Sequence, residues 1–373
     1  MTKKIFYICY YGGDNRSKSL AAEYKIRYIC EALNENGVSV EIVSASGTLS
    51  DCWSPGKYEQ LYSQTIIKRF SSWGAGNIFR RTLSRWWTLT MMFFYLLRRI
   101  KRGDNVIVYH SLGYMGMIQM LKLIRGFNLI LEFEEVYGDV FDNMKVAKKE
   151  IKFAQLASSY LFPTEFLNDC INKNKKPHAI IYGSYNTPTI STPKFNDGRI
   201  HVLYSGSFDS RKGGVIMAIE MARFLPENYH VHISGFGSVD DTKKTQRCID
   251  DISQECKCKI TYEGCLSDIE YTSLLQRCHI GLNTFNPDAK FNETSFPSKL
   301  LAYLGYNLRV VSISISPITR SKIANLLNYY YEQTPEKIAE AVVNVDMVTP
   351  FNGQDELRYL ASDFKHQISE LLQ

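Results

Sequence analysis

Two segments in the second half of the sequence combine glycines, cations and a helix start in a way that suits a bound diphosphate. Residues 203–214 read Leu-Tyr-Ser-Gly-Ser-Phe-Asp-Ser-Arg-Lys-Gly-Gly, so an apolar run ends in a glycine turn that is followed by Arg211 and Lys212. Glycines let the backbone approach a ligand, a helix N-terminus presents free N–H groups, and cations neutralise phosphate charge. A strand–glycine–helix turn without a ligand is the alternative.

The other segment is a polar stretch that leads through Pro297 into a helical pattern, because proline favours the first helical position. Ser298 and Lys299 fall in the first turn, where a lysine is unfavourable to the helix dipole. We therefore predict that an anion shares this site with the lysine, and a tolerated surface lysine is the alternative. Between the two segments, Gly235 and Gly237 follow an apolar run. No third glycine and no acidic strand end complete a dinucleotide fingerprint, which argues against a dehydrogenase.

Strands and helices must position these segments, and the sequence alternates the two kinds throughout. Apolar runs that read as strands occur in both halves, at 5–10, 38–43, 105–110, 127–132, 201–204, 230–233, 260–262, 280–284 and 310–313. This order is typical of parallel α/β sheets. Residues 186–199 have a linker composition. We therefore predict an N-terminal Rossmann-like domain at 1–185, a C-terminal one at 200–354, and a last helix, 355–373, that packs back on the first domain.

Composition excludes several classes of protein. The chain has 373 residues, enough for two domains, and its net charge of +6 is too small to indicate a nucleic-acid-binding protein. Its nine cysteines are scattered and odd in number, so we expect reduced thiols and no zinc site. No signal peptide is recognisable, and no apolar stretch reaches the roughly 18 residues of a membrane span, so we expect a cytoplasmic protein.

Residues 80–102 combine a short apolar run with basic flanks. The run from Trp86 to Leu97 is almost entirely apolar, and arginines and lysines lie on both sides of it. Such a segment is too short to cross a bilayer, but it fits a helix that lies in the interface of an anionic membrane. Tryptophan and arginine are favoured at that depth. We therefore predict peripheral contact with the inner face of the membrane, and a buried helix with basic ends is the alternative.

The order of motifs over 201–312 resembles the donor-binding domain of retaining GT-B glycosyltransferases, in particular glycosyltransferase family 4. That family shows a strand ending in glycine, a Lys-Gly turn, a Gly-x-Gly strand end, a further strand leading to a glycine, a Phe-Pro-x-Lys-Leu helix and a Val-Val-Ser strand. The matching residues here are Ser205-Gly206-Ser207, Lys212-Gly213, Gly235 with Gly237, Gly264, Phe296 to Leu304, and Val310 to Ser312. The first half of the chain resembles the family in architecture.

The resemblance implies an α/β GT-B fold, in which two Rossmann-like, doubly wound domains face one another across a cleft. It implies a retaining, metal-independent glycosyltransferase without a cofactor. The donor would be a nucleotide sugar and the acceptor a saccharide, here lipid-linked, in bacterial capsule, O-antigen or other cell-surface polysaccharide assembly. The donor-binding residues that it implies are Gly12, Gly13, Ser207, Arg211, Lys212, Gly235, Gly237, Cys265, Leu266, Ser295, Phe296, Pro297, Ser298 and Lys299.

The same resemblance implies where the transfer and the acceptor would be handled. His110, which follows a central strand, and Glu293 are the catalytic candidates. Glu134, Glu135 and Tyr137, in the loop after the next strand, are the acceptor-binding candidates. A histidine of the core and a solvated acidic loop are the respective alternatives.

The sequence departs from the family pattern at three positions. Ser207 stands where the family has an arginine, for which Arg211 is the candidate substitute, and the family's two glutamates correspond to Thr294 and Ala302. These departures favour a second interpretation, a non-catalytic GT-B subunit that partners an active transferase. A GT-B sugar-nucleotide epimerase is a third interpretation, although it would have no use for a membrane-facing basic helix.

Overall fold

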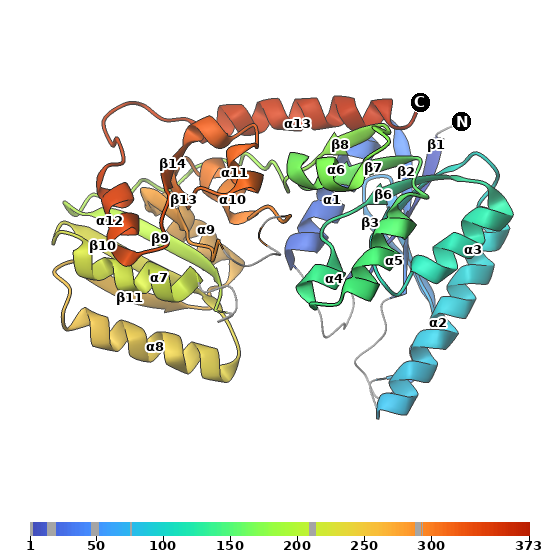
Figure 1. Cartoon of the computed structure of the whole chain (residues 1–373), viewed down its shortest axis with the longest axis horizontal. Helices are drawn as coiled ribbons and strands as arrows, with labels where there is room; N and C mark the ends of the chain where they lie inside the picture. The colour runs from blue at the N-terminus through green and yellow to red at the C-terminus, as the bar shows by residue number, and fades with distance from the viewer. Residues whose placement is uncertain are drawn as a thin grey trace. The chain divides into compact units, whose positions relative to one another are not determined.

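The chain divides into two compact units whose boundary runs through the last helix. The computed structural model describes residues 3–12, 20–45, 52–74, 77–208, 214–287, 292 and 294–373. One unit is Met1–Ser184 with Asp363–Gln373, and the other is Tyr185–Ser362. The prediction gave the first domain residues 355–373. Figure 1 shows α13 (Gly353–Glu370) as one continuous helix, and the boundary between the two units falls within it, at Asp363.

An eight-stranded sheet, in the order β3-β4-β2-β1-β5-β6-β7-β8, forms the centre of the described part of the first unit. Only β3 and β4 pair antiparallel within it, and the other neighbours are parallel. The central strands read as continuous apolar runs because both faces of the sheet are buried. The strands are β1 (Lys3–Ile8), β2 (Val38–Ser44), β3 (Lys57–Tyr62), β4 (Thr65–Arg69), β5 (Asn105–Tyr109), β6 (Asn128–Glu132), β7 (Ser159–Phe162) and β8 (His178–Ile180).

Three helices of the first unit, α2, α5 and α6, begin after residues whose side chains satisfy free backbone N–H groups. The side chains of Asn77, Asn143 and Thr164 accept hydrogen bonds from backbone N–H groups at the starts of α2, α5 and α6. Their apolar faces join one core with the sheet. The helices are α1 (Leu20–Glu35), α2 (Ile78–Arg99), α3 (Met115–Arg125), α4 (Tyr137–Val140), α5 (Met144–Ala154) and α6 (Glu165–Ile171).

The second unit contains a parallel sheet in the order β11-β10-β9-β12-β13-β14. The first strand of the unit is third in this order, with the next two strands on one side and the last three on the other. Dinucleotide-binding domains share this 3-2-1-4-5-6 arrangement, whose ligands bind at the carboxyl ends of the strands where the order reverses. The strands are β9 (Ile200–Ser207), β10 (Tyr229–Phe236), β11 (Lys259–Gly264), β12 (Ile280–Asn283), β13 (Arg309–Ile313) and β14 (Leu327–Tyr330).

Local sequence signals explain how the helices of the second unit begin and end. Ser267 and Glu270 form a capping box at α9, and Thr334 caps α12. Asn307 has a φ of 54°, a left-handed conformation that commonly follows a helix end and here follows α10. The helices are α7 (Gly214–Glu220), α8 (Val239–Ser253), α9 (Asp268–Arg277), α10 (Lys299–Gly305), α11 (Ser316–Thr319) and α12 (Pro335–Val343), with 3₁₀ turns at Met221–Phe224 and Ala324–Leu326.

The predicted linker is bound to the second unit along much of its length. Gln276 Oε1 accepts hydrogen bonds from the N–H groups of Ser191 and Thr192, at 2.8 and 2.7 Å. Lys194 Nζ donates to the carbonyl oxygens of Cys278 and Tyr306, at 2.7 and 3.1 Å. The segment therefore forms a strap on this unit, because its polar groups find partners there.

Both units are thus α/β domains of the doubly wound type predicted from the sequence. None of the helices among the described residues combines the length and the apolar character that a membrane span requires.

Candidate functional site

Two glycines at the carboxyl ends of β9 and β10 lie side by side. The strand register pairs Gly235 with Gly206, and their φ angles are 156° and 157°. A Cβ atom on Gly235 would lie 1.8 Å from the carbonyl oxygen of Gly206. Only glycine therefore permits this approach, and the edge of the sheet presents main-chain atoms here.

Lys299, the first residue of α10, brings a cation to the same place. A Cβ atom on Gly206 would lie 3.3 Å from Lys299 Nζ. The ammonium group also lies 4.3 Å from the centroid of the Tyr204 ring, which attracts it through a cation–π interaction. The structure therefore joins the two sequence segments that were predicted to hold a diphosphate.

The buried side chain of Tyr303, one turn further along α10, fixes this arrangement. Its hydroxyl oxygen accepts a hydrogen bond from the Ser205 N–H at 3.0 Å, and the hydroxyl donates to the Leu282 carbonyl oxygen at 3.3 Å. A Cβ atom on Gly281 would lie 2.3 Å from the Tyr303 ring, so that glycine makes room for it. Tyr303 thereby ties α10, and with it Lys299, to β9 and β12.

The start of α7 is held against the end of β12. Thr284 Oγ1 donates to the Gly214 carbonyl oxygen at 2.6 Å, and a Cβ atom on Gly214 would lie 2.1 Å from the Thr284 carbonyl oxygen. Within the described residues, α7 begins at Gly214. Four predicted site residues, Gly13, Arg211, Lys212 and Glu293, lie outside the described residues.

The remaining donor-site candidates follow strand ends of the same sheet or precede α10. Ser207 ends β9, and a Cβ atom on Gly237 would lie 2.9 Å from the Cβ of Phe208. Cys265, which is exposed, and the half-buried Leu266 follow β11. These residues therefore share one edge of one sheet, although they arise from three strands.

One detail of the predicted helix start is wrong. Proline was expected at the first helical position, but the helix begins at Lys299 and Ser298 is its N-cap residue. Phe296 and Pro297 are buried ahead of the cap, and Ser295 is half-buried. The Leu300 N–H already donates to the Pro297 carbonyl oxygen at 3.0 Å, so a tight turn precedes the regular helix.

His110, the catalytic candidate of the first unit, lies in an aromatic stack. Its ring lies 4.3 Å from that of Phe133 and 5.3 Å from that of Tyr137, centroid to centroid, and the residue is 1% exposed. Burial lowers the pKa of His110 to about 4, so its imidazole is neutral near pH 7. A catalytic role stays a prediction, and it requires this aromatic cover to open.

Glu150, which sequence reasoning did not single out, lies beside His110. Its Oε1 is 3.4 Å from His110 Nε2 and accepts a hydrogen bond from the Tyr137 N–H at 3.0 Å. Its Oε2 accepts from the Gly138 N–H at 2.7 Å, and burial raises its pKa. The carboxylate therefore fixes the loop that carries Tyr137, one of the predicted acceptor-binding residues.

The acidic loop after β6 is partly bound to the rest of the first unit. Glu134 Oε1 forms an ion pair with Lys25 Nζ at 2.5 Å, so this acceptor candidate is not simply a solvated acid. Glu135, the second glutamate of this loop, is half-buried. Glu132, at the end of β6, is fully buried and bonds the Tyr7 hydroxyl. Burial and the charge of Glu134 raise the pKa of Glu132 to about 8.

Gly12 lies against a cation that the sequence did not reveal. Its φ is 54°, and its N–H donates to Glu23 Oε1 at 3.0 Å. Arg69 Nη1 donates to the Tyr11 carbonyl oxygen at 2.7 Å, and a Cβ atom on Gly12 would lie 2.9 Å from Arg69 Nη2. The predicted N-terminal glycine turn is therefore flanked by a guanidinium group.

Comparison with known proteins shows a likeness in fold. Neither a protein-family model nor a curated protein sequence matches the chain. A ligand-free OtsA structure superposes with a TM-score of 0.70 at 11% identity, covering 100% of this chain and 99% of that one. A structure described as trehalose-6-phosphate from E. coli bound with UDP-2-fluoro glucose superposes with a TM-score of 0.66 at 12% sequence identity. This match covers 100% of this chain and 99% of that one. A sucrose-phosphate synthase from Thermosynechococcus elongatus superposes with a TM-score of 0.63 at 12% sequence identity, and the match covers 99% of this chain and 95% of that one.

The chain therefore has the GT-B fold, with two Rossmann-like α/β domains, as predicted. The trehalose-phosphate synthases among these neighbours are GT-B enzymes of glycosyltransferase family 20. The likeness consequently does not single out family 4, and identities of 9–13% show the fold alone.

Proposed function

We propose that this chain is a glycosyltransferase that binds a nucleotide sugar at the carboxyl edge of the second unit's sheet. One observation carries the proposal: the Lys299 ammonium lies beside the paired glycines Gly206 and Gly235, where the strand order reverses. Main-chain atoms leave room for a diphosphate, and the ammonium balances its charge. Arg211 and Lys212 would add positive charge from the segment between β9 and α7.

The proposed reaction moves the sugar from the diphosphate to an acceptor hydroxyl group with retention of configuration. The bond between the anomeric carbon and the phosphate oxygen breaks, a bond from that carbon to the acceptor oxygen forms, and the hydroxyl proton passes to the departing diphosphate. Positive charge at Lys299 stabilises this diphosphate. In this proposal, lysine and arginine side chains, and not a metal ion, neutralise the charge of the diphosphate. Because related structures are described as UDP-forming synthases or as bound with a UDP sugar, UDP sugars are the first donors to test.

Titration calorimetry with UDP, UDP sugars and GDP sugars tests the donor site. A charge-assisted contact contributes about 1.5–3 kcal/mol, so Lys299→Ala should weaken donor binding about 10- to 100-fold. Lys337→Ala is the matched control, because Lys337 is an exposed lysine of the same unit that pairs with Glu340 on α12. If Lys299→Ala and the control bind the donor equally well, the proposed donor site is wrong. A wild-type protein that binds none of these nucleotides favours the non-catalytic subunit.

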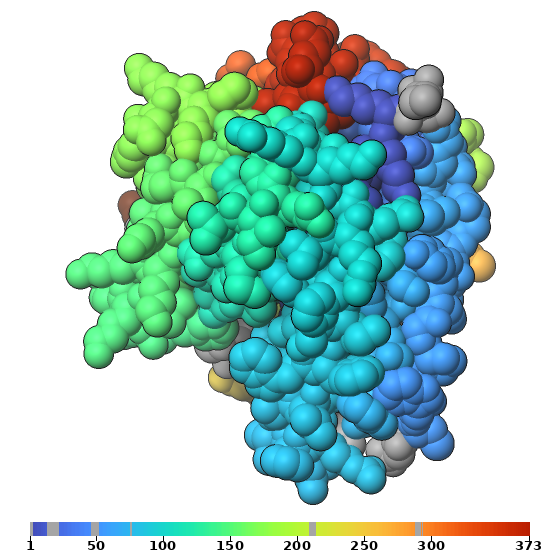
Figure 2. All heavy atoms as spheres, turned by 90° about the vertical axis from the view of Figure 1, so that its right-hand side faces the viewer, coloured from blue at the N-terminus to red at the C-terminus, as the bar shows by residue number. Residues whose placement is uncertain are grey.

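We further propose that the acceptor is lipid-linked. In this proposal, α2 holds the protein on the inner, cytoplasmic face of an anionic membrane. Figure 2 shows α2 and α3, in cyan and teal, on one face of the first unit. On α2, the side chains of Phe79 and Trp86 are 73% and 68% exposed, and on α3 that of Leu123 is 86% exposed. These exposed side chains argue against the alternative interpretation, in which this helix is buried and only its ends are basic.

The first half of α2 buries hydroxyl groups and exposes aromatic side chains. The buried residues of α2 are Ser84, Thr88, Met92 and Leu96, so the first half of the helix buries hydroxyl groups. Ser84 Oγ accepts from the Trp73 N–H at 3.0 Å and donates to its carbonyl oxygen at 3.1 Å. An amphipathic helix that faces water has the opposite arrangement. This inversion, with arginines on the same helix, supports contact with an anionic bilayer.

Co-sedimentation with phosphatidylglycerol-rich liposomes tests the membrane contact. Burying two aromatic side chains contributes roughly 2–4 kcal/mol, so Phe79→Ser with Trp86→Ser should weaken binding more than about 10-fold. The control replaces Ile269 and Val348, which are 83% and 93% exposed in the second unit, by serine. Equal loss in both double variants, or no binding by wild type, would contradict the proposal. Efficient turnover of a soluble sugar phosphate would instead indicate an acceptor such as the glucose-6-phosphate bound in a Burkholderia xenovorans trehalose-phosphate synthase.

A further inference from the structure

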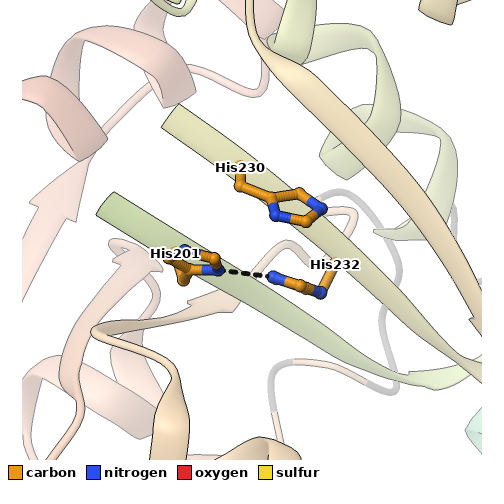
Figure 3. A group of neighbouring side chains, drawn as sticks. All are labelled: His201, His230 and His232. Atoms are coloured by element: carbon orange, nitrogen blue, oxygen red, sulfur yellow. Dashed lines mark hydrogen bonds between the residues drawn. The ribbon is translucent and has the colours of Figure 1, made fainter. Parts of the chain in front are cut away.

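Three buried histidines gather where β9 and β10 begin, at the opposite edge of the sheet from Gly206 and Gly235. His201 lies on β9, His230 is its register partner on β10, and His232 is two residues further along the same strand. Because side chains alternate along a strand, all three face the same side of the sheet. They are 1%, 7% and 3% exposed, and one ring nitrogen of each lies within 4.8 Å of the others (Figure 3).

Carboxylates fix the tautomers of two of these rings. His201 Nε2 lies 2.9 Å from Asp197 Oδ1, and His232 Nδ1 lies 2.7 Å from Glu263 Oε1. Ionised carboxylates only accept hydrogen bonds, so the hydrogens of these contacts belong to the two ring nitrogens.

The other nitrogens of the same two rings then face each other as lone pairs. His201 Nδ1 and His232 Nε2 are 2.8 Å apart. Two neutral imidazoles whose hydrogens point at carboxylates offer no hydrogen for this contact, so a cation, either a proton or a metal ion, has to lie between them. His230 Nε2 lies 2.8 Å from Thr261 Oγ1, and Figure 3 shows its second ring nitrogen on the side of the other two histidines.

We propose that His201, His230 and His232 bind a divalent transition-metal ion of the zinc class. The ligands would be His201 Nδ1, His232 Nε2 and a ring nitrogen of His230, with water at a fourth, tetrahedral position. Imidazole nitrogens suit zinc and its neighbours in the first transition series. Metal-ligating histidines commonly donate their second N–H to a carboxylate, as His201 and His232 do here.

The contact between His201 and His232 requires only a small adjustment to accept the ion. Zinc–nitrogen bonds of about 2.0–2.1 Å place tetrahedral ligand nitrogens about 3.3 Å apart. The 2.8 Å contact between His201 and His232 would therefore open by about half an ångström. Positive charge on Lys259 and Arg199 lies near His230 and opposes a bound cation, whereas Asp197 and Glu263 offset it.

The ion would brace the second unit and would not touch the donor. Asp197 belongs to the strap that precedes β9, His201 to β9, and Glu263 to β11, so one metal centre would link the strap to three strands. This inference is independent of the proposed glycosyl transfer, which needs no metal at the opposite edge of the sheet. Its failure would leave the donor site untouched.

Metal analysis of the full chain, purified without a polyhistidine tag, tests the site. After dialysis against a chelator, we expect one equivalent of Zn²⁺ or Co²⁺ to bind per chain, and Co²⁺ to show the visible absorption of a tetrahedral nitrogen site. His201→Asn with His232→Asn should lose this equivalent. His366→Asn, at an exposed histidine of α13, should keep it. A thiolate charge-transfer band that persists in the double variant would overturn the proposal, because the metal would then be bound by cysteine.

A gentler variant covers the case in which the histidine substitutions prevent folding. Glu263 is 25% exposed at its side chain, so Glu263→Gln should fold and still bind donor while weakening metal affinity about 10- to 100-fold. Glu340→Gln, on α12, is the matched control. Wild-type protein that binds no stoichiometric metal, or Glu263→Gln with unchanged affinity, would refute the site.

Discussion

Replacing Gly235 by alanine should separate β9 from β10 at the edge that carries Lys299. The added Cβ would lie 1.8 Å from the Gly206 carbonyl oxygen, whereas real Cβ contacts essentially never fall below 3.0 Å. The obstructing atom belongs to the backbone of a central strand, so no side chain can rotate away. The two strand ends have to move apart by about 1 Å or more, given how steeply close-packed atoms repel.

The expected cost combines two effects. Overpacking of this kind typically costs about 1–3 kcal/mol, and the φ of 156° adds about 1–3 kcal/mol for a residue other than glycine. A total of about 4 kcal/mol would lower the midpoint of thermal unfolding of a unit of this size by roughly 8–16 °C. Donor binding should also weaken at temperatures where the variant is folded, because the strand ends that flank Lys299 have moved.

Gly264→Ala separates the two effects. Gly264 ends the neighbouring strand β11 with a φ of 73°, and a Cβ atom there would meet nothing within 4 Å. This variant therefore reports backbone strain alone, and differential scanning calorimetry should show a smaller loss than for Gly235→Ala. If both variants unfold at the same temperature and bind donor equally, the close approach of the two glycines is not a constraint and the reasoning fails.

Two further predictions concern the first unit. The raised pKa of Glu132, about 8 against an ordinary 4.5, means that the folded protein keeps a proton that the unfolded chain releases, so stability falls as pH rises from about 4.5 to about 8. Glu132→Gln should remove a pH-dependent loss of a few kcal/mol, measured by urea unfolding at several pH values, and an unchanged pH slope would contradict this. His110→Phe should fold because its neighbours are aromatic, and it should bind donor but lose turnover; retained turnover would exclude the catalytic role.

Buried parallel strands were predictable from the sequence, and exposed ones were not. Val310 to Ile313 reads as a β-branched run because both of its faces are buried. Strand β3, Lys57–Tyr62, is polar and half exposed at the edge of its sheet, so it carries no apolar run. Its partner β4 was likewise missed. Edge strands are specified by pairing with a neighbour, which single-sequence patterns do not show.

Within the site, residue types were predictable where the backbone itself needs them. The glycines at 206 and 235 and the lysine at 299 belong to recognisable local patterns, and the structure brings them together. Glu132 depends instead on Tyr7, which is 125 residues away in the sequence. The histidines of β9 and β10 likewise come together through strand register, so their spacing in the sequence does not predict the cluster.

The paired glycines also bear on how donor preference could be altered. Their edge of the sheet presents peptide atoms, and peptide atoms are the same whichever base or sugar is attached to a diphosphate. Substitutions at Gly206 or Gly235 would thus decide whether any donor fits, without choosing between donors. In the proposed donor site, discrimination between donors would come from side chains next to the glycines, such as those of Cys265 and Leu266 after β11. A library for changed donor preference therefore belongs at those positions, with the glycines held constant.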